Sequence, residues 1–368
     1  MKYYYIDDHA DAARSFALGF SQNDIFVEII PINNFEEAIS NLVSKNDIEG
    51  LILDHKLEEF STPNGGNLSF RGTSIAQEIR NRQKSTEQAY KVKEYPIFLL
   101  SATDNILRLL DTTGEDLFDI IISKDELKTT TYIDYITKMK ACSSAYARIR
   151  KDNGNINKIL NIEISKINFQ FSEFYDENLR IKPIHEIAMF LLRQLILKRG
   201  LLIDELTLAA RFGIDKSASS DWDNLKEIII HSKYSGAYSD AYDRWWMSLL
   251  NIWWQEISPK SLRILTSEER IKVIADKYQL KELYPIKPLP RAKSPYYWTI
   301  CKGLDYPIDE MDGVIIANQS NLYSWQEPDY VSIEEALKRT NISKWKALSP
   351  ISKMQIDELI ETLDNEPK

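Results

Sequence analysis

The chain has few cysteines and no long apolar run, and these absences exclude several classes of protein. Cys142 and Cys301 are the only two cysteines among 368 residues, and they show no CxxC spacing and no nearby histidine pair. This usage argues against a disulfide framework or a structural zinc site and favours a reducing cytoplasm. No segment offers the ~20 uninterrupted apolar residues of a membrane span, and Asp7 and Asp8 stand where a signal peptide needs an apolar core. We therefore expect a cytoplasmic protein without a membrane segment.

Basic residues are also in the minority, which bears on the choice of partner. The net charge is −9, and acidic residues outnumber basic ones on both sides of residue 155. Because binding to phosphate backbones needs a concentrated basic face, nucleic acid is an unfavoured partner. The second half also contains no Walker loop, no glycine-rich dinucleotide fingerprint and no nucleophile elbow.

The first 150 residues alternate between short apolar runs and amphipathic segments. We expect strands at 2–6, 26–30, 51–53, 96–100 and 119–122, with helices at 10–20, 35–44, 72–82, 106–110 and 132–150. A long loop rich in Gly, Asn and Ser is expected from Glu58 to Arg71. This alternation predicts right-handed βαβ units and a doubly wound, five-stranded parallel sheet.

Polar residues follow four of these expected strands. They are Asp7 and Asp8, Asp54, Ser101 and Lys124. All carboxyl ends of a parallel sheet lie along one edge, so these side chains are expected to converge. Three crowded carboxylates repel one another, and Mg²⁺, which prefers carboxylate oxygens, relieves that repulsion. A carboxylate held there can attack a phosphoryl group, with the lysine pairing with its oxygens.

The four motifs YYYIDDH, GLILDHKL, FLLSATD and DIIISKDEL resemble the strand ends of response-regulator receiver domains over residues 1 to 150. The resemblance implies a flavodoxin-like fold in which Asp54 accepts phosphate, Ser101 signals its presence and Lys124 contacts it. It also implies a Mg²⁺ site formed by Asp7, Asp8, Asp54 and the backbone carbonyl of Lys56.

The sequence departs from the usual receiver pattern in several places, one of which is an insertion near Gln83 to Glu94. Asp125 follows the lysine where proline is usual, and Ile121 stands where an aromatic residue is common. The loop after Asp54 is longer than usual and contains Asn64, Gly65 and Gly66. The acids that favour phosphate chemistry are all present, whereas the aromatic residue and the proline of the usual switch are replaced.

The rest of the chain changes in character. We expect a linker at 151–158 and a mainly helical partner-binding or effector domain over 159–368, which we do not recognise. A helix is expected over 184–199, and another, capped by Ser239 or Asp240, carries four tryptophans that serve as core or as a protein interface. The proline-rich segment 284–298 is expected to be an extended strap, and Asp309, Glu310 and Asp312 a solvated turn.

The leading function is a two-component signalling protein. A histidine kinase or another phosphodonor passes phosphate to Asp54 in a phosphorelay, and the helical domain carries the message to a protein partner. No enzymatic activity beyond self-phosphorylation is expected. The alternative is a pseudo-receiver adaptor that is never phosphorylated, in either case compatible with a bacterial defence operon.

A third class, the haloacid-dehalogenase phosphohydrolases, is less favoured, because its nucleophile lies in a DxD motif on the first strand. The sequence leaves open the kinase, the partner, the pathway and whether the chain forms a homodimer.

Overall fold

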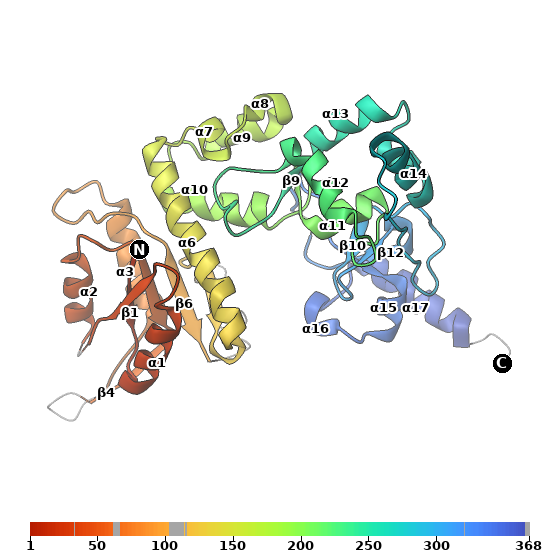
Figure 1. Ribbon diagram of the computed structural model, residues 1–368. Helices are drawn as coiled ribbons and strands as arrows, with labels where there is room; N and C mark the ends of the chain where they lie inside the picture. The colour runs from red at the N-terminus through yellow and green to blue at the C-terminus, as the bar shows by residue number, and fades with distance from the viewer. Residues whose placement is uncertain (33, 62–66, 103–113, 115, 320, 365–368) are drawn as a thin grey trace. The chain divides into compact units, whose positions relative to one another are not determined.

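The computed structural model describes residues 1–32, 34–61, 67–102, 114, 116–319 and 321–364 (Figure 1). Three stretches of the chain form a first compact unit: Met1–Ile162, Glu173–Leu192 and Gly236–Ala241. The stretches between and after them form a second: Glu163–Ser172, Arg193–Ser235 and Tyr242–Lys368. This division by contacts differs from the expected domains at 1–150 and 159–368, whose limits remain predictions. Among the described residues, none of the helices combines the length and apolarity needed to cross a membrane.

A five-stranded parallel sheet forms the centre of the first unit. Its strands are β1 (Lys2–Ile6), β2 (Phe26–Ile29), β3 (Gly50–Asp54), β6 (Ile97–Ser101) and β7 (Ile120–Ser123). They lie in the order β2-β1-β3-β6-β7, and every neighbouring pair is parallel. This is the order of flavodoxin-like doubly wound sheets. The expected fold class of the N-terminal part is confirmed.

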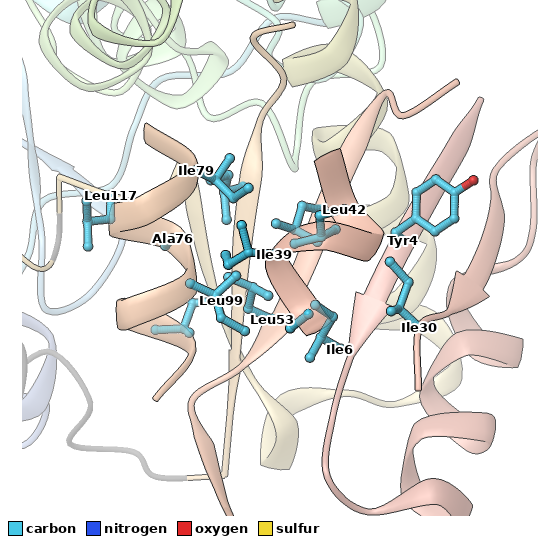
Figure 2. Close-up of a cluster of buried hydrophobic side chains, with 14 of the residues drawn as sticks. Tyr4, Ile6, Ile30, Ile39, Leu42, Leu53, Ala76, Ile79, Leu99 and Leu117 are labelled. Carbon is cyan, nitrogen blue, oxygen red and sulfur yellow. The ribbon is translucent and has the colours of Figure 1, made fainter. Parts of the chain in front are cut away.

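Helices cover both faces of this sheet. The helices are α1 (Ala10–Phe20), α2 (Phe35–Val43), α3 (Gly72–Lys84) and α6 (Thr129–Lys151). On one face, Ile39 and Leu42 of α2 and Ile79 of α3 pack in one cluster with Leu53 and Leu99 of the sheet (Figure 2). On the other face, the Tyr3 hydroxyl donates to the carbonyl oxygen of Met139 in α6 at 2.9 Å. Burial on both faces explains why β3 and β6 are apolar almost throughout.

Two antiparallel strands follow β3, so the expectation of a long loop is wrong for residues 58–61 and 67–71, and residues 62–66 lie outside the described part of the chain. Strands β4 (Lys56–Ser61) and β5 (Asn67–Arg71) pair antiparallel, with an irregularity between Leu57 and Phe60. After β5 the backbone at Gly72 passes very close to the end of β3. A Cβ atom added at Gly72 would lie only 2.2 Å from the carbonyl oxygen of Asp54. Only glycine tolerates so close a backbone approach. The helix expected at 106–110 lies outside the described residues.

A buried ion pair joins the sheet to its covering helices. The Arg80 guanidinium of α3 lies 2.9 Å from the Asp119 carboxylate, and both side chains are buried. Asp119 also accepts hydrogen bonds from the Ile97 amide at 2.8 Å and from the Tyr146 hydroxyl of α6 at 2.8 Å. These contacts satisfy the buried charges and hold the starts of β6 and β7 in register.

Short helices complete the first unit. Four residues separate the end of α6 from the start of helix α7 (Ile156–Leu160), and α9 (Phe169–Asn178) begins in one unit and ends in the other. Helix α10 (Ile184–Leu191) packs against α6. The helix expected over 184–199 is shorter, because a π-helical turn follows at Leu192–Ile196, where the chain passes to the second unit.

The second unit is mainly helical, as expected. Its helices are α8 (Ile164–Ile167), α11 (Glu205–Phe212), α12 (Trp222–Ile228), α13 (Met247–Ile257), α14 (Ser267–Tyr278), α15 (Ile333–Lys338), α16 (Ile342–Trp345) and α17 (Pro350–Asp364). Its strands are β8 (Leu202–Ile203), β9 (Trp245–Trp246), β10 (Thr299–Cys301), β11 (Tyr306–Ile308), β12 (Gly313–Ile315) and β13 (Tyr330–Ser332). The last four form a small sheet in the order β11-β10-β13-β12.

Two expectations for this unit need correction. Trp245 and Trp246 do not start a helix, because they form β9 and pair with β8; only Trp253 and Trp254 lie in α13. All four tryptophans are buried, which confirms their role as core. The acidic turn is not solvated either. Asp309 and Asp312 are buried, and the Asp312 carboxylate accepts backbone N–H groups of the proline-rich strap.

Candidate functional site

Three carboxylates meet where two strands of the first unit's sheet end. Asp7 and Asp8 follow β1, and Asp54 is the last residue of the neighbouring β3. One carboxylate oxygen from each lies within 4.8 Å of the others. The expected convergence of these acids is therefore observed in the structure. It follows from strand order alone, since β1 and β3 are adjacent and parallel.

Lys124 supplies the positive charge of this cluster. It directly follows β7, and its Nζ atom lies 2.7 Å from Asp54 Oδ1 and 3.4 Å from Asp7 Oδ2. The same ammonium group lies 5.2 Å from the centre of the Phe16 ring of α1. Lys124, which follows strand β7, thus contacts two of the three acids, Asp54 and Asp7.

Asp54 is held almost out of contact with water. Its side chain is 7% exposed. Burial raises the pKa of Asp54, the nearby Lys124 opposes that rise, and the charges of Asp7 and Asp8 add to it. An anion in this position gains from any further cation that reaches its free oxygens.

The two remaining predicted residues, Ser101 and Lys56, lie near Asp54, the first through strand pairing and the second in sequence. Ser101 is buried at the end of β6, opposite Ser123 of β7 and one residue beyond the partner of Asp54. Lys56 starts β4 and pairs with Arg71 of β5. The roles of the Ser101 hydroxyl and of the Lys56 carbonyl remain predictions.

The sequence reasoning missed a hydroxyl group in the site. Tyr5, fully buried in β1, donates a hydrogen bond to Asp7 Oδ2. Residues i and i+2 of a strand point to the same face, so the spacing of Tyr5 and Asp7 was an available signal. From the sequence, Tyr5 is predicted only as part of an aromatic strand.

The donor set fits a divalent cation. Three carboxylates and one ammonium group carry a formal charge of −2, and all the side-chain donors are the hard oxygens that Mg²⁺ prefers. The carboxylates that would hold the ion are those of Asp7, Asp8 and Asp54.

The residues that depart from the receiver pattern take up ordinary positions. Ile121 is half-buried and packs against the cluster under α2 and α3. Asp125 is exposed in the short 3₁₀ turn that follows β7. Neither side chain fills the place of an inward-turning aromatic ring.

Comparisons with known proteins find likenesses of structure only. No protein-family model and no curated protein matches the sequence. One similar structure is a CheY-like response-regulator receiver domain from Methylobacillus flagellatus, at 13% identity, covering 37% of this chain and 98% of that one, with a TM-score of 0.27. Another is the response regulator TrrA from Thermotoga maritima in complex with Mg²⁺ and BeF, at 16% identity, 37% and 97% coverage and a TM-score of 0.27.

A third similar structure is the N-terminal domain of a response regulator/sensory box/GGDEF protein from Carboxydothermus hydrogenoformans. It is 18% identical, covers 40% of this chain and 97% of that one, and has a TM-score of 0.30. All three match the N-terminal part and leave the second unit unmatched. At such low values the fold is decided by strand order, which here is 2-1-3-4-5 along the chain. The N-terminal part has the flavodoxin-like fold.

Proposed function

We propose that the first unit is a phosphoacceptor receiver that takes a phosphoryl group on Asp54 and signals through the second unit. The observation that carries the proposal is the contact of Lys124 Nζ with Asp54 Oδ1 at 2.7 Å, beside Asp7 and Asp8. The four side chains come from the ends of three parallel strands. The arrangement combines a nucleophile, a cation for phosphoryl oxygens and a donor set for Mg²⁺.

The transfer itself is simple to balance. An oxygen of the Asp54 carboxylate forms a bond to phosphorus, while the bond from phosphorus to the donor's nitrogen or oxygen breaks. The leaving imidazole or carboxylate takes the electron pair, and water supplies any proton it gains. Lys124 exchanges its contact with the carboxylate for one with a phosphoryl oxygen, and Ser101 donates to another. A bound Mg²⁺ would neutralise negative charge on the oxygens of the phosphoryl group while it is transferred.

The phosphodonor is a histidine kinase or a small acyl phosphate, and a protein partner of the second unit receives the signal. The proposal assigns the chain no turnover besides this self-phosphorylation. For such a switch, phosphate must favour one conformation of the chain over another.

A second function has an observation in its favour. The Asp54 side chain is only 7% exposed, and Ile121 offers no aromatic ring to turn inward. Both features suit an adaptor that keeps the receiver fold for docking and is never phosphorylated.

Labelling with radioactive acetyl phosphate and Mg²⁺ separates these functions. The intact chain and the control variant Asp125→Asn, changed at an exposed neighbour of Lys124, are expected to take up acid-labile label. Asp54→Asn is expected to take up none while its circular dichroism stays unchanged. Label on the Asp54→Asn variant refutes the phosphoacceptor assignment. An unlabelled intact chain favours the adaptor, and steady turnover of p-nitrophenyl phosphate revives a phosphohydrolase.

A further inference from the structure

Tyr5 lies on the face of β1 that α6 covers. The Tyr3 hydroxyl, two residues earlier in the strand, donates to Met139 of α6, whereas Tyr4 belongs to the cluster on the opposite face. Alternation along the strand therefore places Tyr3 and Tyr5 on the same side of the sheet. The Tyr5 side chain has no exposure to solvent. Its only polar atom is buried beside the acids.

Every oxygen of the Asp7 carboxylate has a donor. Asp7 Oδ1 accepts the backbone N–H of His9 at 2.8 Å. Asp7 Oδ2 accepts the Tyr5 hydroxyl and lies 3.4 Å from Lys124 Nζ. The Asp7 side chain is itself unexposed to solvent. Hydrogen bonds to both oxygens hold the Asp7 carboxylate in one orientation. The Tyr5 hydroxyl supplies the hydrogen bond to Oδ2.

We propose that Tyr5 is a positioning residue of the metal site, acting through Asp7. This inference rests on the proposed binding of Mg²⁺ by Asp7, Asp8 and Asp54. Tyr5 lies within the YYYIDDH motif, but the receiver resemblance assigns roles to the acids of that motif and none to Tyr5. Hydrogen-bond partners of metal-binding carboxylates fix the carboxylate's direction, and their loss typically weakens metal binding by about 10- to 100-fold.

Tyr5 also determines how Lys124 is shared. The ammonium group is closer to Asp54 than to Asp7, at 2.7 Å against 3.4 Å. Because the Tyr5 hydroxyl already satisfies Asp7 Oδ2, Lys124 is left to pair with Asp54. Removal of the hydroxyl leaves a buried oxygen short of a donor and draws Lys124 toward Asp7. Two of the three metal-binding carboxylates are then disturbed.

Tyr5→Phe in the full chain tests the proposal, with Mn²⁺ titrated in place of Mg²⁺ and free Mn²⁺ followed by electron paramagnetic resonance. The dissociation constant is expected to rise about tenfold. Tyr3→Phe, which removes a hydroxyl on the same face that bonds to α6 instead of an acid, is the matched control and is expected to leave the constant within about twofold. Circular dichroism without metal checks that both variants keep the fold.

A second pair of variants separates an effect through Asp7 from partial unfolding, because an unfolded Tyr5→Phe variant loses Mn²⁺ affinity whether or not Asp7 is present. In an Asp7→Ala background, a residue that acts only through Asp7 has no further effect, so adding Tyr5→Phe is expected to change Mn²⁺ affinity by less than about twofold. Further loss there, or an affinity of Tyr5→Phe equal to that of the unmodified chain, overturns the role of Tyr5 and leaves the metal site intact. No Mn²⁺ binding by the unmodified chain overturns the metal site as well.

Discussion

Asp54 is an acid placed where its ionised form is costly, and this has a consequence for stability. Burial raises the pKa of Asp54 above its usual value of 3.8. The protonated form is therefore the one that the fold favours. Its contribution to stability is complete below pH ~3.8, the unfolded value, and is lost as the pH rises through the higher folded pKa.

Asp54→Asn removes this cost, because the amide does not ionise. At pH 7, without metal, we expect the variant to be more stable than the unmodified chain, because burial of the ionised carboxylate no longer opposes folding. The gain shrinks as the pH falls toward 4, and saturating Mg²⁺ removes it by stabilising only the unmodified chain. Urea unfolding between pH 4 and 8, followed by circular dichroism with and without chelator, measures the difference. A pH-independent loss of stability in the variant would contradict the assigned cause.

At this scale the sequence predicted the acids and the lysine but not their supporting contacts. Asp7, Asp54 and Lys124 were placed together by the rule that parallel strands end at one edge, which needs no side-chain detail. The hydrogen bond from Tyr5 depends on rotamers inside a packed layer, and strand patterns do not encode rotamers. Tyr5 therefore looked like one more apolar residue.

Among the elements, strands β4 and β5 after β3 are the case where amino-acid composition led to a wrong prediction. Segment 58–71 was expected to be a loop because it is rich in Gly, Asn and Ser. Its ends nevertheless form β4 and β5, and the dipeptide Asn64-Gly65 between them is a common hairpin signal that was available. The strands of the central sheet were easier to predict, because burial on both faces makes them continuously apolar.

Helix α10 has its first turn bound by an acid from a distant segment. Glu94 Oε2 accepts both the backbone N–H and the ring Nδ1–H of His185, each at 2.9 Å. Burial lowers the pKa of His185 below 6.5, and the charges of Arg80 and Lys84 act in the same direction against the opposing effect of Glu94. Protonation of this imidazole is therefore harder in the folded chain than in the unfolded chain.

The sign of the pH effect follows from this lowered pKa. The contribution of His185 to stability is complete above pH ~6.5 and is lost as the pH falls through the folded pKa, since the unfolded chain binds the proton first. We expect His185→Gln, which keeps an N–H donor, to reduce the loss of stability between pH 7 and pH 5. His231→Gln, at an exposed histidine, is expected to leave it unchanged. Urea midpoints across this range measure both, and equal slopes in all three proteins would rule out His185 as the source.

On the scale of the whole molecule, the two compact units are not consecutive along the chain. Segments Glu173–Leu192 and Gly236–Ala241 return to the first unit after the chain has entered the second. No pattern in the sequence indicates this return, because a helix that packs on α6 has the same apolar periodicity as one that packs elsewhere. The expected boundary at residue 150 rested on a polar stretch, which the structure shows as the turn between α6 and α7.

A fragment ending at Ile162 therefore lacks part of its own unit. Helix α10, with buried Ile187 and Leu191, packs against α6 in the intact chain. Losing these two side chains alone costs at least about 3 kcal/mol of burial. We expect fragment 1–162 to show faster amide hydrogen exchange in α6 than the intact chain does, and to bind a dye for exposed apolar surface. Equal protection of α6 in both would show that the returning segments add nothing to the stability of the unit.

The distribution of tryptophan gives the chain an optical asymmetry. All eight tryptophans belong to the second unit, whereas the acids and Lys124 belong to the first. Indole fluorescence is consequently silent about events confined to the acidic cluster. A change in tryptophan emission on addition of beryllofluoride and Mg²⁺ would therefore report a structural change in the second unit, and no attached label is needed to see it.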